Sequence, residues 1–79
     1  MSPTIFREGP YRFFFNSREE TRRHVHVATA DGTAKFWLEP QIELESHYNV
    51  RSKDLAPMEE IKREHADEFR AAWDRHFSQ

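Results

Sequence analysis

The hydrophobic positions of residues 24–40 alternate with polar ones in two runs that flank Asp31-Gly32. An Asp-Gly pair between alternating runs is a strong signal for a β-hairpin, because both residues tolerate the positive φ of a two-residue type I′ turn. With such a loop, His26 pairs with Trp37. The alternation therefore predicts an antiparallel hairpin as the central element of the chain.

This hairpin is expected to have two faces of different chemistry, because side chains alternate across a strand. The first face is apolar and is expected to join the core; it carries Val25, Val27, Ala34, Phe36 and Leu38. The second face gathers ionisable side chains around an indole ring; it carries His24, His26, Lys35, Trp37 and Glu39. Chemistry or binding is therefore expected on the second face.

Residues 2–7 and 11–16 predict two further strands joined through Gly9-Pro10, because they are rich in aromatic and β-branched side chains. The second of these strands is apolar on both faces, which predicts cover on both. This strand lies centrally in the sheet, or one of its faces meets a partner or ligand.

Residues 17–23 are polar and show no regular spacing of apolar residues, so a loop is expected there. Its three arginines either clamp a phosphate or keep the loop solvated.

The C-terminal half predicts a helix, because apolar residues recur at spacings of three and four between Leu55 and Phe77. Before it, residues 41–45 predict a short strand or turn, and residues 47–50 a connection. The expected architecture is α+β. A small antiparallel sheet of about four strands, in two hairpins, packs against one long C-terminal α-helix, and residues 1–79 form a single domain.

Composition is that of a small soluble domain, with 79 residues, 37% of them hydrophobic and 33% charged. No cysteine is present, which excludes disulfides and thiolate metal sites. No apolar run reaches the length of a membrane span and no signal-peptide pattern is found, so a cytoplasmic location is expected.

The net charge of −2 conceals an asymmetry along the chain. Residues 1–37 hold six basic and four acidic side chains, a balance of +2, whereas residues 38–79 hold six basic and ten acidic ones, a balance of −4. A mildly basic sheet half suits an anion or a nucleic acid. Two solvated faces of different composition would give the same asymmetry.

Candidate catalytic residues come from the paired histidines His24 and His26, whose Cβ atoms lie roughly 6.5–7 Å apart on a strand. Such a pair suits general acid–base chemistry on a phosphodiester, because the reference pKa of histidine lies near neutrality. Lys35 would stabilise the charge that develops on the phosphate. Trp37 offers a surface on which a base can stack. The candidates for substrate or partner binding are Trp37, Arg12 and Arg23.

Two other interpretations of the same face stay open. The histidines also fit as two ligands of a metal ion that Glu39 or His47 completes, but a His-x-His pair alone supplies too few ligands, and we assign no metal and no cofactor. Alternating His-Val-His-Val is also an ordinary amphipathic strand, whose histidines pack against tryptophan and hydrogen-bond to Glu39.

Several motifs together resemble a known family. They are Ser-Pro-Thr-Ile near the start, Tyr-Arg-Phe-Phe-Phe, His-Val-His-Val, Ala-Lys-Phe-Trp-Leu-Glu-Pro and a late Ala-Trp. This combination resembles the bacterial domain-of-unknown-function family 4160, although members often carry a proline where this chain has Arg23. The resemblance implies a short stand-alone protein encoded beside a second small protein, in an arrangement like a toxin–antitoxin module.

Within such a module, the resemblance implies that this chain is the toxin-like component, held by a small cognate antitoxin-like protein. The family supplies no catalytic residues. The histidine face adds a ribonuclease-type activity on RNA as the candidate chemistry. The alternative is a non-catalytic protein-binding module that uses its aromatic sheet face. A homo-oligomer is compatible with a chain of this length.

Overall fold

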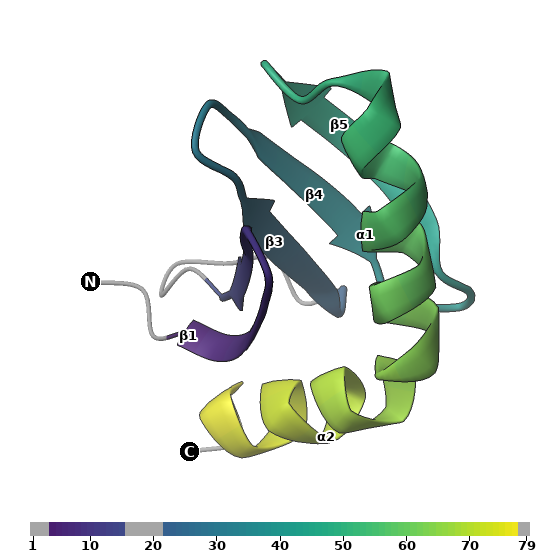
Figure 1. Cartoon of the computed structure of the whole chain (residues 1–79). Helices are drawn as coiled ribbons and strands as arrows, with labels where there is room; N and C mark the ends of the chain where they lie inside the picture. The colour runs from purple at the N-terminus through teal and green to yellow at the C-terminus, as the bar shows by residue number, and fades with distance from the viewer. Residues whose placement is uncertain (1–3, 16–21, 78–79) are drawn as a thin grey trace.

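The computed structural model describes residues 4–15 and 22–77 and confirms the α+β class. Two helices cover one face of a five-stranded antiparallel sheet, whose strands lie side by side in chain order (Figure 1). The strands are β1 (Thr4–Glu8), β2 (Tyr11–Phe14), β3 (His24–Ala28), β4 (Thr33–Trp37) and β5 (Glu43–Tyr48). The helices are α1 (Ser52–Glu64) and α2 (Ala66–Phe77).

Part of the sequence-based prediction lies outside the described residues. This applies to the beginning of the first predicted strand, to residue 16 at the end of the second, and to residues 17–21 of the predicted arginine loop. Within the described residues, neither helix is long and apolar enough to cross a membrane.

The central hairpin closes through a four-residue loop, residues 29–32, and the predicted two-residue type I′ turn is wrong. Thr29 organises this loop. Its Oγ1 accepts hydrogen bonds from the backbone N–H groups of Asp31 and Gly32, at 3.2 and 3.0 Å, and its own N–H donates to the Gly32 carbonyl at 2.9 Å. Neither Asp31 nor Gly32 has a positive φ. The threonine side chain thus selects a wider turn than the Asp-Gly pair alone favours.

The pairing of β3 with β4 consequently differs from the prediction by two residues. His26 lies opposite Lys35, and His24 lies opposite Trp37. A shift by an even number leaves every side chain on its predicted face, because the period of a strand is two. The apolar face is buried against the helices, as predicted from Val25, Val27, Ala34, Phe36 and Leu38.

The sheet has a fifth strand where the sequence predicted a short strand or turn and then a connection. β5 pairs along the whole of β4, with one irregularity between Lys35 and Phe36 that leaves Glu45 as the extra residue. Every residue of β5 is exposed. Because β5 buries no side chain, it lacks the apolar alternation by which strands are recognised.

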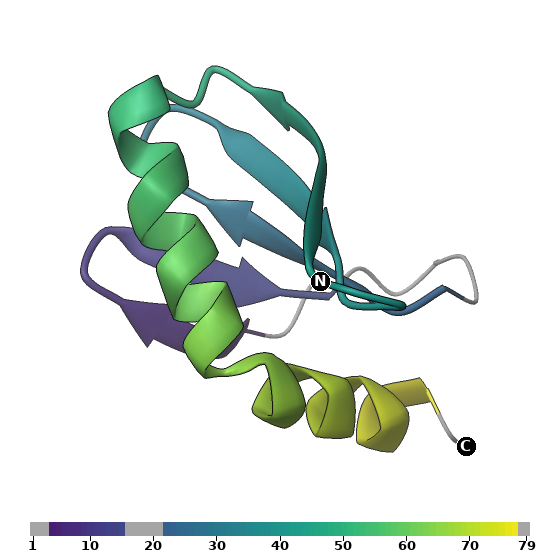
Figure 2. The same ribbon diagram turned by 90° about the vertical axis from the view of Figure 1, so that its right-hand side faces the viewer.

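The single predicted helix is two helices that meet at His65. The backbone of His65, with φ −110° and ψ 16°, ends α1, and its N–H donates to the Ile61 carbonyl at 3.0 Å. Figure 2 shows α1 crossing the sheet and α2 turning away along one end of it. Because the chain changes direction at His65, the apolar residues of α1 and those of α2 pack against different parts of the sheet. Met58 of α1 and both Phe69 and Trp73 of α2 belong to the same buried cluster.

The core between the sheet and the helices is largely aromatic. The ring centroids of Phe13 and Phe69 are 5.2 Å apart, and those of Phe15 and Trp73 are 5.3 Å apart. Phe13 in β2 and Phe15 directly after it are fully buried in this core, whereas Phe14 between them points to the opposite face, where it is 9% exposed. The doubly apolar strand of the sequence therefore has one face in the core and one on the side away from the helices.

Candidate functional site

The sheet face that the helices leave uncovered, here called the open face, carries three rows of side chains that run across the strands. The first row consists of Phe14, His26, Lys35 and Ser46. The second row consists of Arg12, Ala28, Thr33 and Tyr48. The third row consists of His24, Trp37 and Glu43. The rows place most of the predicted site residues on one surface.

Cations lie over the aromatic rings of the open face. Arg12 Cζ is 4.5 Å from the centroid of Phe14. Arg22 Cζ and Lys35 Nζ are 4.1 and 4.7 Å from the centroid of Trp37. Each such contact is worth about 0.5–1 kcal/mol at an exposed site, and it holds the cation at a defined place. The open face therefore presents positive charge and flat rings together.

The two candidate catalytic histidines are in contact but differ in exposure. Their ring centroids are 5.2 Å apart. His24 is fully buried, with the rings of Trp37 and Trp73 at 5.7 and 4.8 Å. Its Nδ1 lies 2.7 Å from the Arg22 carbonyl, which only accepts hydrogen bonds, so this contact assigns the proton to Nδ1. His26 is partly exposed and is the histidine of the pair that presents surface to a ligand.

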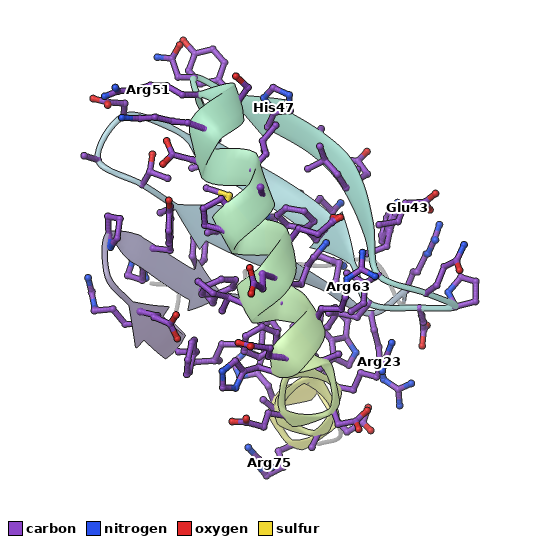
Figure 3. All side chains as sticks on the ribbon, turned by 45° about the vertical axis from the view of Figure 1, so that its right-hand side comes forward. Arg23, Glu43, His47, Arg51, Arg63 and Arg75 are labelled. Atoms are coloured by element: carbon purple, nitrogen blue, oxygen red, sulfur yellow. The ribbon has the colours of Figure 1, made fainter. Side chains whose placement is uncertain are left out.

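Arg23, a predicted binding residue, is engaged with carboxylates of the chain itself. Its guanidinium bonds Glu39 Oε1 at 2.9 Å and both Oδ atoms of Asp74 at 2.7 and 2.8 Å. The bonds to Asp74, and then to Glu39, raise the pKa of Arg23. Figure 3 shows Arg23 beside α2, which is seen end-on. Arg23 thus ties the beginning of β3 to α2, and the neighbouring Arg22 lies on the open face instead.

Among the described residues, the two side chains proposed to complete a metal site do not form a ligand group with the histidine pair. The Glu39 carboxylate is bonded to the side chain and the backbone N–H of Arg23. His47 lies opposite the core residue Ala34, on the helix side of the sheet, and Figure 3 shows it far from Arg23. Across residues 4–15 and 22–77, no group of three or more histidine or carboxylate side chains is arranged to hold a metal ion.

A hollow of about 220 Å³ opens on the open face where the first two rows meet. Its lining consists of His26, Thr33, Ala34, Lys35, Ser46, His47 and Tyr48. Sequence reasoning placed Thr33 in the hairpin without assigning it to the site, and it missed Ser46 and Tyr48 because the predicted short strand ended before them. The period-two spacing of Ser46 and Tyr48 was the signal that could have extended the face onto a further strand. Arg22 was missed for a similar reason, since it shares the spacing of His24 and His26.

Comparison with known proteins gives one match. The model of a family described as "Domain of unknown function (DUF4160)" matches residues 11–74, most of the chain, from β2 into α2. No curated protein and no solved structure matches the chain. The family resemblance drawn from the sequence motifs is therefore confirmed, and the description of the family states no activity.

Proposed function

We propose that this chain, which belongs to the DUF4160 family, is a toxin-like component that binds single-stranded RNA on the open face of its sheet. The observation that carries the proposal is the pairing of cations with rings, Arg12 on Phe14 and both Arg22 and Lys35 on Trp37. The toxin-like role follows the family resemblance, which implies a module with a small cognate antitoxin-like protein.

Single strands are bound by surfaces that combine positive charge, which follows the phosphates, with rings on which bases stack. The open face has both properties. The helix layer on the other side of the sheet has the opposite balance, with seven acidic and five basic residues in the sequence of α1 and α2. This distribution orients a polyanion toward the sheet rather than toward the helices.

The geometry supports binding more directly than cleavage. A two-histidine mechanism needs both imidazoles within hydrogen-bond reach of the reacting atoms. His26 meets this condition on the open face, whereas His24 lies behind Trp37 and Trp73. Ribonuclease chemistry by the pair stays a prediction, and it requires one of the two indole rings to move aside.

A specific observation also supports the second candidate function, a non-catalytic protein-binding module. All six residues of β5 are exposed, including Leu44 and Tyr48, which retain 37% and 72% of their surface. An exposed edge strand offers backbone groups with which a strand of a partner can pair. A cognate protein that bound in this way would contact β5, whereas RNA would lie across β2 to β5.

RNA binding is tested by the fluorescence anisotropy of a labelled, unstructured RNA oligonucleotide. The double variant Arg12→Gln/Lys35→Gln is expected to bind about tenfold more weakly, because two phosphate contacts are lost. The slope of log affinity against log salt concentration is expected to become shallower by about 1.4, because each phosphate contact on a single strand contributes about 0.7.

The matched control is Arg63→Gln/Arg75→Gln, which removes the same charge from the helix layer. It is expected to bind RNA within about twofold of the wild type, because exposed charges beyond a Debye length of ~10 Å act weakly. Equal losses in the two double variants would show that only net charge matters, and they would contradict the placement of RNA on the open face.

A further inference from the structure

We propose that the hollow on the open face is a mononucleotide subsite. The phosphate of one nucleotide is held beside Lys35 and His26, and its base stacks on Tyr48. This inference rests on the proposed function and deepens it, because it names the unit of RNA that the surface recognises and the strand, β5, that completes the site.

The three residues are brought together by the register of the sheet. Lys35 lies opposite His26 on one side and Ser46 on the other. Tyr48 stands on the next row, two residues beyond Ser46 on the same strand and opposite Thr33. Rows on one face are roughly 6.5–7 Å apart. A phosphate at Lys35 and a base at Tyr48 are therefore within the reach of a single nucleotide.

The phosphate end of the subsite has a held cation and neighbouring polar groups. Lys35 lines the hollow and is half-buried, and its Nζ lies 4.7 Å from the centroid of Trp37, a contact that holds the ammonium at a defined place. Thr33, His26 and Ser46 add donors around it. The Ser46 hydroxyl donates to Glu45 in the structure, and it turns to a phosphate only by breaking that bond. Charge-assisted bonds to phosphate oxygens are stronger than neutral ones.

The size of the hollow fits part of a nucleotide. A volume of about 220 Å³ is the space of about seven water molecules. It falls short of the ~300 Å³ from which small-molecule pockets begin. A phosphate and its sugar fit such a space, and the base then lies outside it.

The base end of the subsite is Tyr48, a residue that is 72% exposed. The backbone of Tyr48 is in close contact with the hairpin loop. A Cβ atom built on Gly32 would lie 2.0 Å from the Tyr48 carbonyl oxygen, so the hairpin loop packs directly against the end of β5. An exposed ring on a fixed backbone is a ready stacking surface for a base.

Titration with uridine 5′-monophosphate, uridine and inorganic phosphate, followed by amide NMR shifts, tests the subsite. The monophosphate is expected to bind at least about tenfold more tightly than either fragment, because it uses both ends. Tyr48→Ala is expected to weaken monophosphate binding about tenfold, whereas Tyr48→Phe keeps the ring and the affinity. Lys35→Gln is expected to reduce monophosphate binding to the level of uridine. Leu44→Ala, on the helix side of β5, is the control and is expected to bind like the wild type.

The subsite would be overturned if the protein bound the monophosphate no more tightly than inorganic phosphate. It would also be overturned if Tyr48→Ala bound the monophosphate as tightly as the wild type. The two proposals fail separately. A wild-type protein that binds the RNA oligonucleotide but not the monophosphate keeps the proposed function and overturns the subsite. A wild-type protein that binds the monophosphate through Lys35 and Tyr48 but not the oligonucleotide keeps the subsite and overturns the proposed function.

Discussion

Gly32→Ala is expected to destabilise the protein by about 3 kcal/mol or more, at the upper end of the cost of overpacking. The added Cβ would lie 2.0 Å from the Tyr48 carbonyl oxygen and 2.5 Å from that of Asn49. Both atoms belong to the backbone, so relief requires the loop to move away from β5. Urea unfolding followed by near-ultraviolet circular dichroism measures the loss.

Gly9→Ala is the matched control, because it adds the same methyl group at a glycine with open space around it. No atom lies within 4 Å of a Cβ built there, but φ is +57°. Only the left-handed conformation is penalised, which costs about 1–2 kcal/mol. A loss at Gly32 no larger than that at Gly9 would contradict the packing of the loop against β5, and with it the fixed position of Tyr48.

Lys62→Met is expected to stabilise the protein at pH 7 by about 1–3 kcal/mol. The Lys62 side chain is fully buried, with Nζ 3.6 Å from the centroid of Phe36 and 3.5 Å from Glu59 Oε1. Burial lowers its pKa to about 8, and the contact with Glu59 offsets only part of this shift. The folded state therefore disfavours the charge, and an apolar side chain of similar length removes that cost.

The same lysine sets the response of stability to pH. Below pH 8 Lys62 is protonated in both the folded and the unfolded chain, so burial of its charge lowers the free energy of unfolding by the full amount. Above pH 8 the folded chain releases the proton, whereas the unfolded chain keeps it up to about pH 10.5, so stability rises with pH. The full gain is about 3 kcal/mol, from a difference of 2.5 pH units.

Tyr11 limits that gain at the alkaline end. Its hydroxyl donates to Asp54 Oδ1 at 2.8 Å, and this bond raises the pKa of Tyr11 above 10.0. From about pH 10 the unfolded tyrosine ionises first, which lowers stability again. Thermal unfolding between pH 7 and 10 is therefore expected to show rising stability in the wild type and a flatter profile in Lys62→Met. Parallel profiles would contradict the role of Lys62.

The faces of the central hairpin were predictable from sequence, but its register was not. Period-two alternation places His26 and Lys35 on one face whatever the loop, provided that the register shifts by an even number. The register depends on the hydroxyl of Thr29, which bonds two backbone N–H groups of the loop. This local competition outweighed the general preference of Asp-Gly for tight turns.

Other features depend on contacts between distant parts of the chain. The break between the helices falls at His65, where no proline or glycine marks it, and the His65 ring packs 4.3 Å from the centroid of Phe6 in β1. The burial of His24 depends on Trp73, which lies near the other end of the chain. No sequence pattern near His65 or His24 indicates these distant contacts. The sequence therefore located the pair His24 and His26, but it could not predict how exposed each histidine is.

Ultraviolet cross-linking of a thiouridine-substituted RNA, with the adducts located by mass spectrometry, tests the central claim most directly. The account predicts adducts on aromatic residues of the open face, above all on the exposed Tyr48 and then on the partly exposed Trp37, because bases stack on accessible rings. Excess unlabelled RNA is expected to suppress them. Adducts confined to the helix layer, or none at RNA concentrations that saturate binding, would contradict the assignment of the open face as the RNA-binding surface.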